Sequence, residues 1–274
     1  MPTISELRSS RELYVNLTLR ELRGKYKRSV LGWFWSMLNP LATMAIFSLV
    51  FAFFLRIDVP VGDPSGLETF AFFLLCGLLP FNFLSASLTG GMSALVGNAN
   101  LVKKVWFQRE LLVAANTSSA GVGLLIELGV LCAALLVAGN FVIPWMVPAL
   151  GILALQVVFV FGLALLLSVL NVYFRDLEHL VGIGLQVWFY ATPIIYPLSL
   201  VEDALTGERD LDGLFTLYQL NPLARFVEAY RACFYDLRWP ELETVGYLVL
   251  VSFGMLALGA AVFNRFEPRL AEEL

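Results

Sequence analysis

The side chains of this sequence that could do chemistry are few, and they form no catalytic or nucleotide-binding pattern. The phosphate-binding pattern GxxxxGK[ST] is absent, because Gly24-Lys25 is followed by Tyr26 and no glycine stands at the required position before it. His179 has no cysteine or second histidine near it in the sequence, which argues against metal coordination. Serine-hydrolase and H-E-x-x-H patterns are also missing. We therefore expect no catalytic residue, no metal site and no bound cofactor on this chain.

Glu127 is an acid deep inside an apolar block. A carboxyl in the middle of a membrane costs about 3 kcal/mol on insertion scales, so it should face other helices, be protonated or pair. The other apolar blocks offer it no basic or histidine partner, which favours a structural hydrogen bond between helices. The alternative is a proton-coupled or secondary flippase for lipid or glycan that uses Glu127.

Three consecutive aromatic residues, Trp188, Phe189 and Tyr190, lie near the middle of another apolar block, whereas membrane aromatics usually gather at the ends of a span. A buried indole N–H or phenol hydroxyl needs a partner, and Gln186 and Thr192 are close enough in sequence to join a polar track. Such a mixture would suit a channel for sugars, whose ring faces are apolar and whose hydroxyls are not. Bulky packing between helices is the alternative interpretation.

The composition indicates the environment that must position these residues. Hydrophobic residues make up 59% of the 274 residues, and charged residues make up 15%. A soluble chain carries about 25% charged residues, so this composition is typical of an integral membrane protein. The net charge of -4 argues against a nucleic-acid partner, which would require a basic groove.

The apolar blocks predict an all-α integral membrane protein with six transmembrane helices in one domain, 1–274. A bilayer core needs about 20 apolar residues per helix, because unpaired peptide groups are costly in hydrocarbon. The expected spans are 31–55, 70–97, 111–138, 147–171, 179–197 and 244–263. The fifth is short and contains Pro193 and Pro197 near its end.

The distribution of lysine and arginine predicts the orientation. With the N-terminus inside, most of the 18 basic residues fall in the segments on the cytosolic side. The positive-inside rule therefore favours both termini in the cytosol, and an even number of spans agrees with this. The charged start of the chain is unlike a signal peptide, so we expect a mature, cytosolic N-terminus.

The segment 11–28 has the spacing of a basic amphipathic helix at the cytosolic interface. Its apolar face is formed by Val15, Leu19, Leu22 and Tyr26, and its basic face by Arg20, Arg23 and Lys27. One interpretation is an anchor that only orients the first span. The other is a lever that joins the spans to a cytosolic motor.

Two further segments lie outside the spans. The cytosolic loop 98–110 mixes basic residues with Val105, Trp106 and Phe107, and such apolar side chains should dock either into lipid headgroups or into a groove of another protein. The outer segment 198–243 contains apolar stretches that are too short to span and are broken at Asn221-Pro222. We expect re-entrant or interfacial helices there.

Several segments, in order along nearly the whole chain, are similar to those of one known family. They are KYKRSVLGWFWSMLNPLATMAIFSLVF, NLVKKVWFQREL, VYFRDLEHL, TPIIYP and NPLARFVEAYR. The chain resembles the permease subunits of type-2 ATP-binding-cassette exporters of polysaccharides, whose members carry O-antigen, teichoic acid, capsule or galactan. It departs from the family at Gln108, where members usually have proline.

The resemblance implies roles for residues of this chain. The ATPase-coupling residues would be Asn100, Leu101, Val102, Lys103, Lys104, Val105, Trp106, Phe107 and Arg109, with a smaller contact from Arg175 and Asp176. The channel candidates are Trp33, Trp35, Gln186, Trp188, Tyr190 and Tyr196. The basic residues that could attract a lipid pyrophosphate are Arg20, Arg23, Lys25 and Lys27.

The resemblance also implies the assembly and its task. Two copies of the chain would enclose one channel and bind two copies of a separate ATPase subunit, which would hold ATP and Mg. The expected function is export of a lipid-linked polysaccharide or teichoic-acid-like polymer across the bacterial cytoplasmic membrane. The remaining partners would be membrane lipids and the lipid-linked glycan itself.

Overall fold

The structure is a computed structural model that describes residues 4–25, 32–54, 59–207 and 212–274. In these ranges every regular element is helical. Four helices are long and apolar enough to cross a membrane: α3 (Phe70–Gly97), α5 (Glu110–Val137), α6 (Met146–Tyr173) and α11 (Leu242–Phe266). Their bounds lie within a few residues of four of the expected spans. A short 3-10 turn, η3 (Ile143–Trp145), precedes α6.

The first and fifth expected spans are helical but less regular. The first consists of η1 (Gly32–Phe34), α2 (Trp35–Phe47) and a wider turn, η2 (Ser48–Phe54). The fifth is α7 (Leu177–Tyr190), whose 14 residues rise about 21 Å, less than a bilayer core of about 30 Å. The helix ends at Tyr190 rather than at 197, because Pro193 has no N–H for the helix and its ring disfavours helical geometry at the residue before it.

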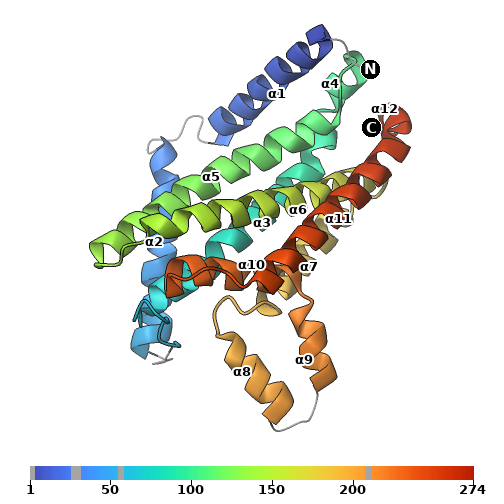
Figure 1. Cartoon of the computed structure of the whole chain (residues 1–274). Helices are drawn as coiled ribbons and strands as arrows, with labels where there is room; N and C mark the ends of the chain where they lie inside the picture. The colour runs from blue at the N-terminus through green and yellow to red at the C-terminus, as the bar shows by residue number, and fades with distance from the viewer. Residues whose placement is uncertain (1–3, 26–31, 55–58, 208–211) are drawn as a thin grey trace.

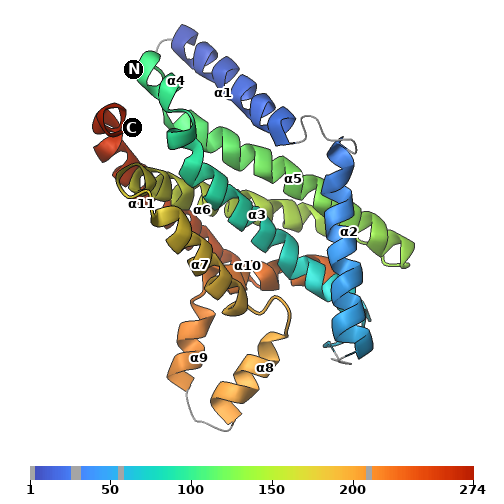
Figure 2. The same ribbon diagram turned by 180° about the vertical axis from the view of Figure 1, so that it is seen from behind.

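Helix α1 (Ile4–Lys25) lies alongside the first half of α5 (Figures 1 and 2). Leu17 is buried in this contact, and the Tyr14 hydroxyl lies 2.5 Å from the Ser118 hydroxyl of α5. Val15 and Leu19, on the expected apolar face, are exposed. The helix thus packs on the protein through Leu13 and Leu17, while of the predicted apolar stripe Val15 and Leu19 are exposed and Leu22 is half-buried; 26–28 lie outside the described residues.

Five short α-helices, one 3-10 turn and two π turns complete the described part of the chain. Helix α4 (Ala99–Lys104) occupies the expected coupling loop, and α12 (Leu270–Glu273) follows η6 (Glu267–Arg269) at the same end of the bundle (Figure 1). At the other end, α8 (Leu198–Glu202), η4 (Asp203–Gly207) and α9 (Asp212–Gln219) project away from the bundle, while α10 (Pro222–Arg231) and η5 (Ala232–Asp236) pack into it.

Two contacts in the core fix how α11 and α10 pack on the other helices. Helices α6 and α11 approach so closely that a Cβ atom at Gly259 would overlap the backbone oxygen of Gly162. Helix α10 is anchored between α3 and α6, because the Tyr230 hydroxyl donates to the Gln156 side chain over 3.0 Å and Gln156 in turn donates to the Pro80 carbonyl over 2.9 Å. Gln156 lies about 15 Å from the start of α6, so α10 reaches well into the bundle.

Candidate functional site

The expected coupling loop has one face anchored in the protein and one face exposed. Val102 is buried, and Leu101 and Phe107 are half-buried against the core. The side chains that face outward are those of Asn100, Lys103, Lys104, Val105 and Trp106. The indole of Trp106 is 91% exposed, although a large aromatic ring gains most from being covered. This loop is therefore anchored to the core by one face while its other face presents an uncovered aromatic residue.

Arg109 has a different environment from the rest of the loop. Its guanidinium Nη1 donates to the backbone carbonyl of Glu267, so it ties the loop to the C-terminal segment. Gln108, at the position where the family usually has proline, is exposed. The structure thus makes Arg109 a bridge inside this chain.

The second expected contact, Arg175 and Asp176, is exposed at the connection between α6 and α7. This connection is held to the end of α3 because the Ser93 hydroxyl donates to Glu178 over 2.7 Å. The Asn171 amide of α6 donates to the same carboxylate and to the Met92 carbonyl of α3, each over 3.3 Å. The residues 175–176 consequently lie at the same end of the bundle as α4, which follows α3 directly.

The basic residues of α1 are divided between solvent and a polar cavity. Arg20 is exposed and pairs with Glu21 over 2.8 Å, Arg23 is exposed, and Lys27 lies outside the described residues. Lys25 lines a cavity of about 290 Å³ between α1, α3 and α5. The other lining residues are Glu21, Gly24, Ala86, Asn116, Ser119 and Ala120. Lys25 is itself exposed, and of the described basic candidates it is the one that lines this open cavity.

Glu127 lies on α5 within reach of the charge on Lys25. The Lys25 Nζ atom is 3.5 Å from the position that a Cβ atom would take at Gly123, one helical turn before Glu127. A cation of α1 is thus the neighbour that the sequence did not reveal, because α1 was not expected to run along a span.

The expected aromatic residues of the fifth span meet at the end of α7. The Trp188 indole N–H donates to Asn221 over 2.8 Å, and the Asn221 amide donates to the Ala191 carbonyl and to the Thr192 hydroxyl over 3.1 and 3.0 Å. Gln186 takes no part in this network and is exposed. The indole N–H of Trp188 is therefore already occupied, and Asn221 is its partner rather than Gln186.

Three tyrosines lie beside this network. The Tyr196 hydroxyl donates to the Tyr190 carbonyl over 2.6 Å and lies 3.4 Å from the Tyr218 hydroxyl. Because the Tyr196 proton is used, Tyr218 is the donor in the second contact. Burial, together with the hydrogen bond to Tyr196, raises the pKa of Tyr218, so this phenol keeps its proton at neutral pH. The ring of Tyr190 remains exposed.

The channel candidates of the first span are separate from this group. Trp35 is exposed on α2, and the side chain of Trp33 lies outside the described residues. Within one chain α3 lies between α2 and α7 (Figure 2). The two aromatic groups of one chain are therefore separated by α3.

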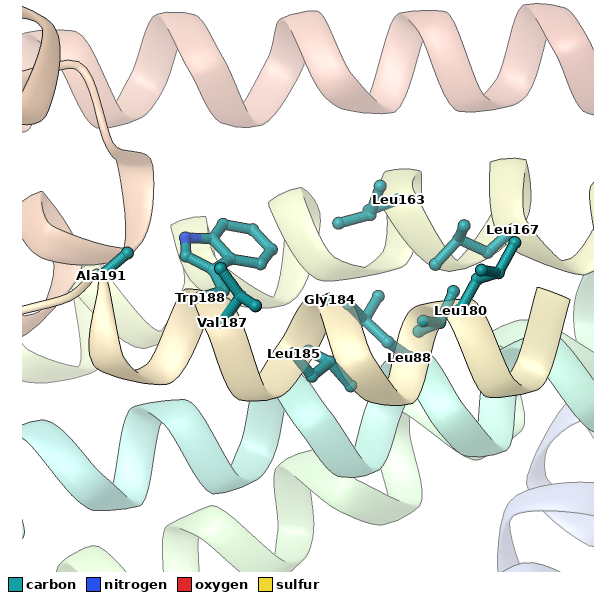
Figure 3. Close-up of a pocket in the computed structure, with 10 residues that line it drawn as sticks. Leu88, Leu163, Leu167, Leu180, Gly184, Leu185, Val187, Trp188 and Ala191 are labelled. Atoms are coloured by element: carbon teal, nitrogen blue, oxygen red, sulfur yellow. The ribbon is translucent and has the colours of Figure 1, made fainter.

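An apolar cavity of about 520 Å³ lies between α3, α6 and α7 (Figure 3). Its lining is formed by Leu88, Leu163, Leu167, Leu180, Val181, Gly184, Leu185, Val187, Trp188 and Ala191. Without a polar side chain other than the indole, this cavity fits an acyl or prenyl chain better than a sugar.

Arg231 is a buried basic residue that the sequence analysis did not single out. Its guanidinium donates to Glu228 over 3.1 Å and to the Ile194 carbonyl over 2.9 Å, and its Cζ atom lies 3.6 Å from the centroid of the Phe73 ring. It thereby joins α10, the turn after α7 and α3. An arginine inside the apolar stretch AYRACFY was the available signal.

In the described part of the chain, no group of three or more potential metal ligands comes together.

Comparison with known proteins assigns the chain to a family. The family model described as "ABC-2 type transporter" matches residues 12–235, which include most of α1 and all of α4, α7 and α10. The chain belongs to the ABC-2 type transporter family. As a member of this family with apolar helices of spanning length, it is a multi-pass membrane protein.

Individual relatives are similar over almost their whole length. The chain is 32% identical to an O-antigen export system permease protein of Myxococcus xanthus, with 99% of this chain and 98% of the relative covered. It is 30% identical to an O-antigen export system permease protein of Klebsiella pneumoniae, covering 96% and 95%. A polysialic acid transport protein of Escherichia coli is 23% identical, with 93% of each chain covered. Two of these relatives are thus named for O-antigen export and the third for polysialic acid transport.

Proposed function

We propose that this chain is the transmembrane subunit of an ATP-driven exporter of a lipid-linked polysaccharide or teichoic-acid-like polymer in the bacterial cytoplasmic membrane, with both termini in the cytosol. The observation that carries the proposal is the exposed Trp106 on an internally anchored loop, in a chain similar to O-antigen export permeases. An ATPase subunit on a separate chain, with its ATP and Mg, supplies the energy. Family membership favours this source of energy over proton coupling through Glu127.

Two copies of the chain and two ATPase subunits form the proposed assembly. The separation of the α2 and α7 aromatics by α3 supports a pair of permeases, because a second copy can bring α2 of one chain towards α7 of the other. The face of α7 that carries Leu180, Ile183, Val187 and Tyr190 is exposed and apolar, as a contact between copies or with lipid requires.

The substrate enters, in this proposal, from the cytosolic leaflet. Its pyrophosphate is attracted by Arg20 and Arg23 and reaches the cavity beside Lys25, where the amide of Asn116 and the hydroxyl of Ser119 can donate hydrogen bonds. When ATP closes the two ATPase subunits, the coupling loops move, the permease halves open a continuous passage and the glycan follows its lipid end.

The proposal is tested by replacing Trp106 with alanine in the complex with the ATPase subunit. An exposed aromatic anchor at a protein interface contributes enough that its loss should weaken binding by at least about tenfold. The measurement is co-purification and titration of the ATPase subunit onto the detergent-solubilised permease, followed by ATPase stimulation with lipid-linked glycan. Trp239→Ala, which removes another exposed indole from the opposite end of the bundle, is the control and should bind normally. Unchanged assembly and export in Trp106→Ala would show that this loop does not couple.

A further inference from the structure

The segment after α11 forms a second wall beside the coupling loop. Leu270 of α12 is fully buried and packs between α4 and the end of α6. Phe266 stacks edge-on against Tyr173 of α6 with ring centroids 5.7 Å apart. The guanidinium of Arg109 donates to the Glu267 carbonyl across the gap. The coupling loop and the segment 266–274 are therefore parts of one structure, although some 160 residues separate them along the chain.

A groove of about 390 Å³ lies between these two walls. Its lining is formed by Trp106, Phe107, Gln108, Arg109, Glu110, Glu267 and Pro268. Glu110 and Glu267 bring two carboxylates to this lining, and Arg109 brings one guanidinium. The Arg109 guanidinium already donates to the backbone carbonyl of Glu267. The indole of Trp106 stands at the edge of the groove with most of its surface uncovered. Carboxylates beside an open indole face are the groups that recognise a cation.

We propose that this groove is a docking subsite for a lysine or arginine side chain of the ATPase subunit. The proposal rests on the function proposed above and extends the coupling surface from the loop alone to the loop and the segment 266–274. A basic side chain placed there would lie over the Trp106 ring and pair with Glu110 or Glu267. Lipid phosphate is disfavoured as the occupant, because the carboxylates would repel it.

The test uses Glu267→Gln in the full permease, titrated with the ATPase subunit. This change removes the charge of Glu267 and preserves the backbone carbonyl that Arg109 binds, so the walls of the groove stay joined. Glu272→Gln is the matched control, because Glu272 is an exposed acid of the same segment that does not line the groove. We expect Glu267→Gln to raise the Kd by about three- to fivefold at low salt, as for a partly exposed ion pair, and Glu272→Gln to leave it unchanged.

Salt separates a lost charge contact from a distorted loop. In about 0.5 M salt, where charges are screened within a few ångströms, the difference between Glu267→Gln and the unchanged protein should disappear. The subsite would be overturned if Glu267→Gln bound the ATPase subunit with the same Kd as the control, or if both variants lost the same affinity. In either case, normal binding of the unchanged permease would still support the proposed function. A shift of Glu267→Gln between monomer and dimer with unaltered ATPase binding would also overturn it, since the groove would then face a second copy. If the unchanged permease failed to bind the ATPase subunit, the proposed function itself would fail.

Discussion

Replacing Asn221 with alanine is expected to release the end of α7 from the start of α10. The Asn221 side chain uses all four of its hydrogen-bonding positions: it accepts from the Trp188 indole and from the Leu223 N–H, and it donates to the Ala191 carbonyl and the Thr192 hydroxyl. Three of these bonds join α10 to the end of α7, and the fourth caps α10.

The size of the effect follows from these four bonds. An interhelical hydrogen bond in a membrane protein contributes about 0.6 kcal/mol on average, so the three bonds to α7 amount to about 2 kcal/mol. Loss of an asparagine cap adds about 1 kcal/mol. We expect Asn221→Ala to lower the free energy of unfolding by about 3 kcal/mol in total.

Asn221→Asp distinguishes the hydrogen bonds that the Asn221 side chain accepts from those that it donates. The carboxylate still accepts from Trp188 and Leu223, but it cannot donate, and the Thr192 hydroxyl is already committed to the Trp188 carbonyl over 2.8 Å. This variant should therefore fall between the unchanged protein and Asn221→Ala.

The assay is denaturant unfolding of the purified permease in detergent, followed by tryptophan fluorescence. Asn264→Ala, at an exposed position of α11, is the control and should change the unfolding free energy by less than about 0.5 kcal/mol. The reasoning would be refuted by an Asn221→Ala protein within about 0.5 kcal/mol of the unchanged protein, or by equal losses in the alanine and aspartate variants.

Two further changes test the packing of the bundle. Gly259→Ala should destabilise the protein by about 1–3 kcal/mol, because its methyl group would overlap the Gly162 backbone. Gly254→Ala, with open space around it, is the control and should be tolerated. Thermal unfolding in detergent compares the two variants, and equal stability would mean that α6 and α11 can separate freely. Tyr230→Phe should lower the free energy of unfolding by about 1 kcal/mol, because the buried Gln156 oxygen loses its donor. Denaturant unfolding measures this loss. An unaltered midpoint would indicate that the Tyr230–Gln156 bond does not hold α10 in place.

The sequence by itself was sufficient for the features that depend on local composition. Apolar runs of spanning length predicted α3, α5, α6 and α11, because the thickness of a bilayer dictates how many consecutive apolar residues a span needs. The sequence also predicted that the apolar side chains of the loop 98–110 need a cover from outside the loop, and Trp106 is 91% exposed, but the sequence did not show that the adjacent Phe107 packs against the core. The end of α7 was placed too late, because an apolar run continues through Pro193 although the helix does not.

Contacts between distant segments were decided by the tertiary structure alone. Periodicity predicted a helix near the N-terminus, but the stripe that packs contains Leu17 rather than Val15 and Leu19, because the choice depends on the surface of α5. In the same way, the partners of Arg109 and Asn221 are a backbone carbonyl and a side chain far away along the chain. A sequence pattern records which groups need hydrogen bonds or burial, whereas the packing of the helices determines which groups meet those needs.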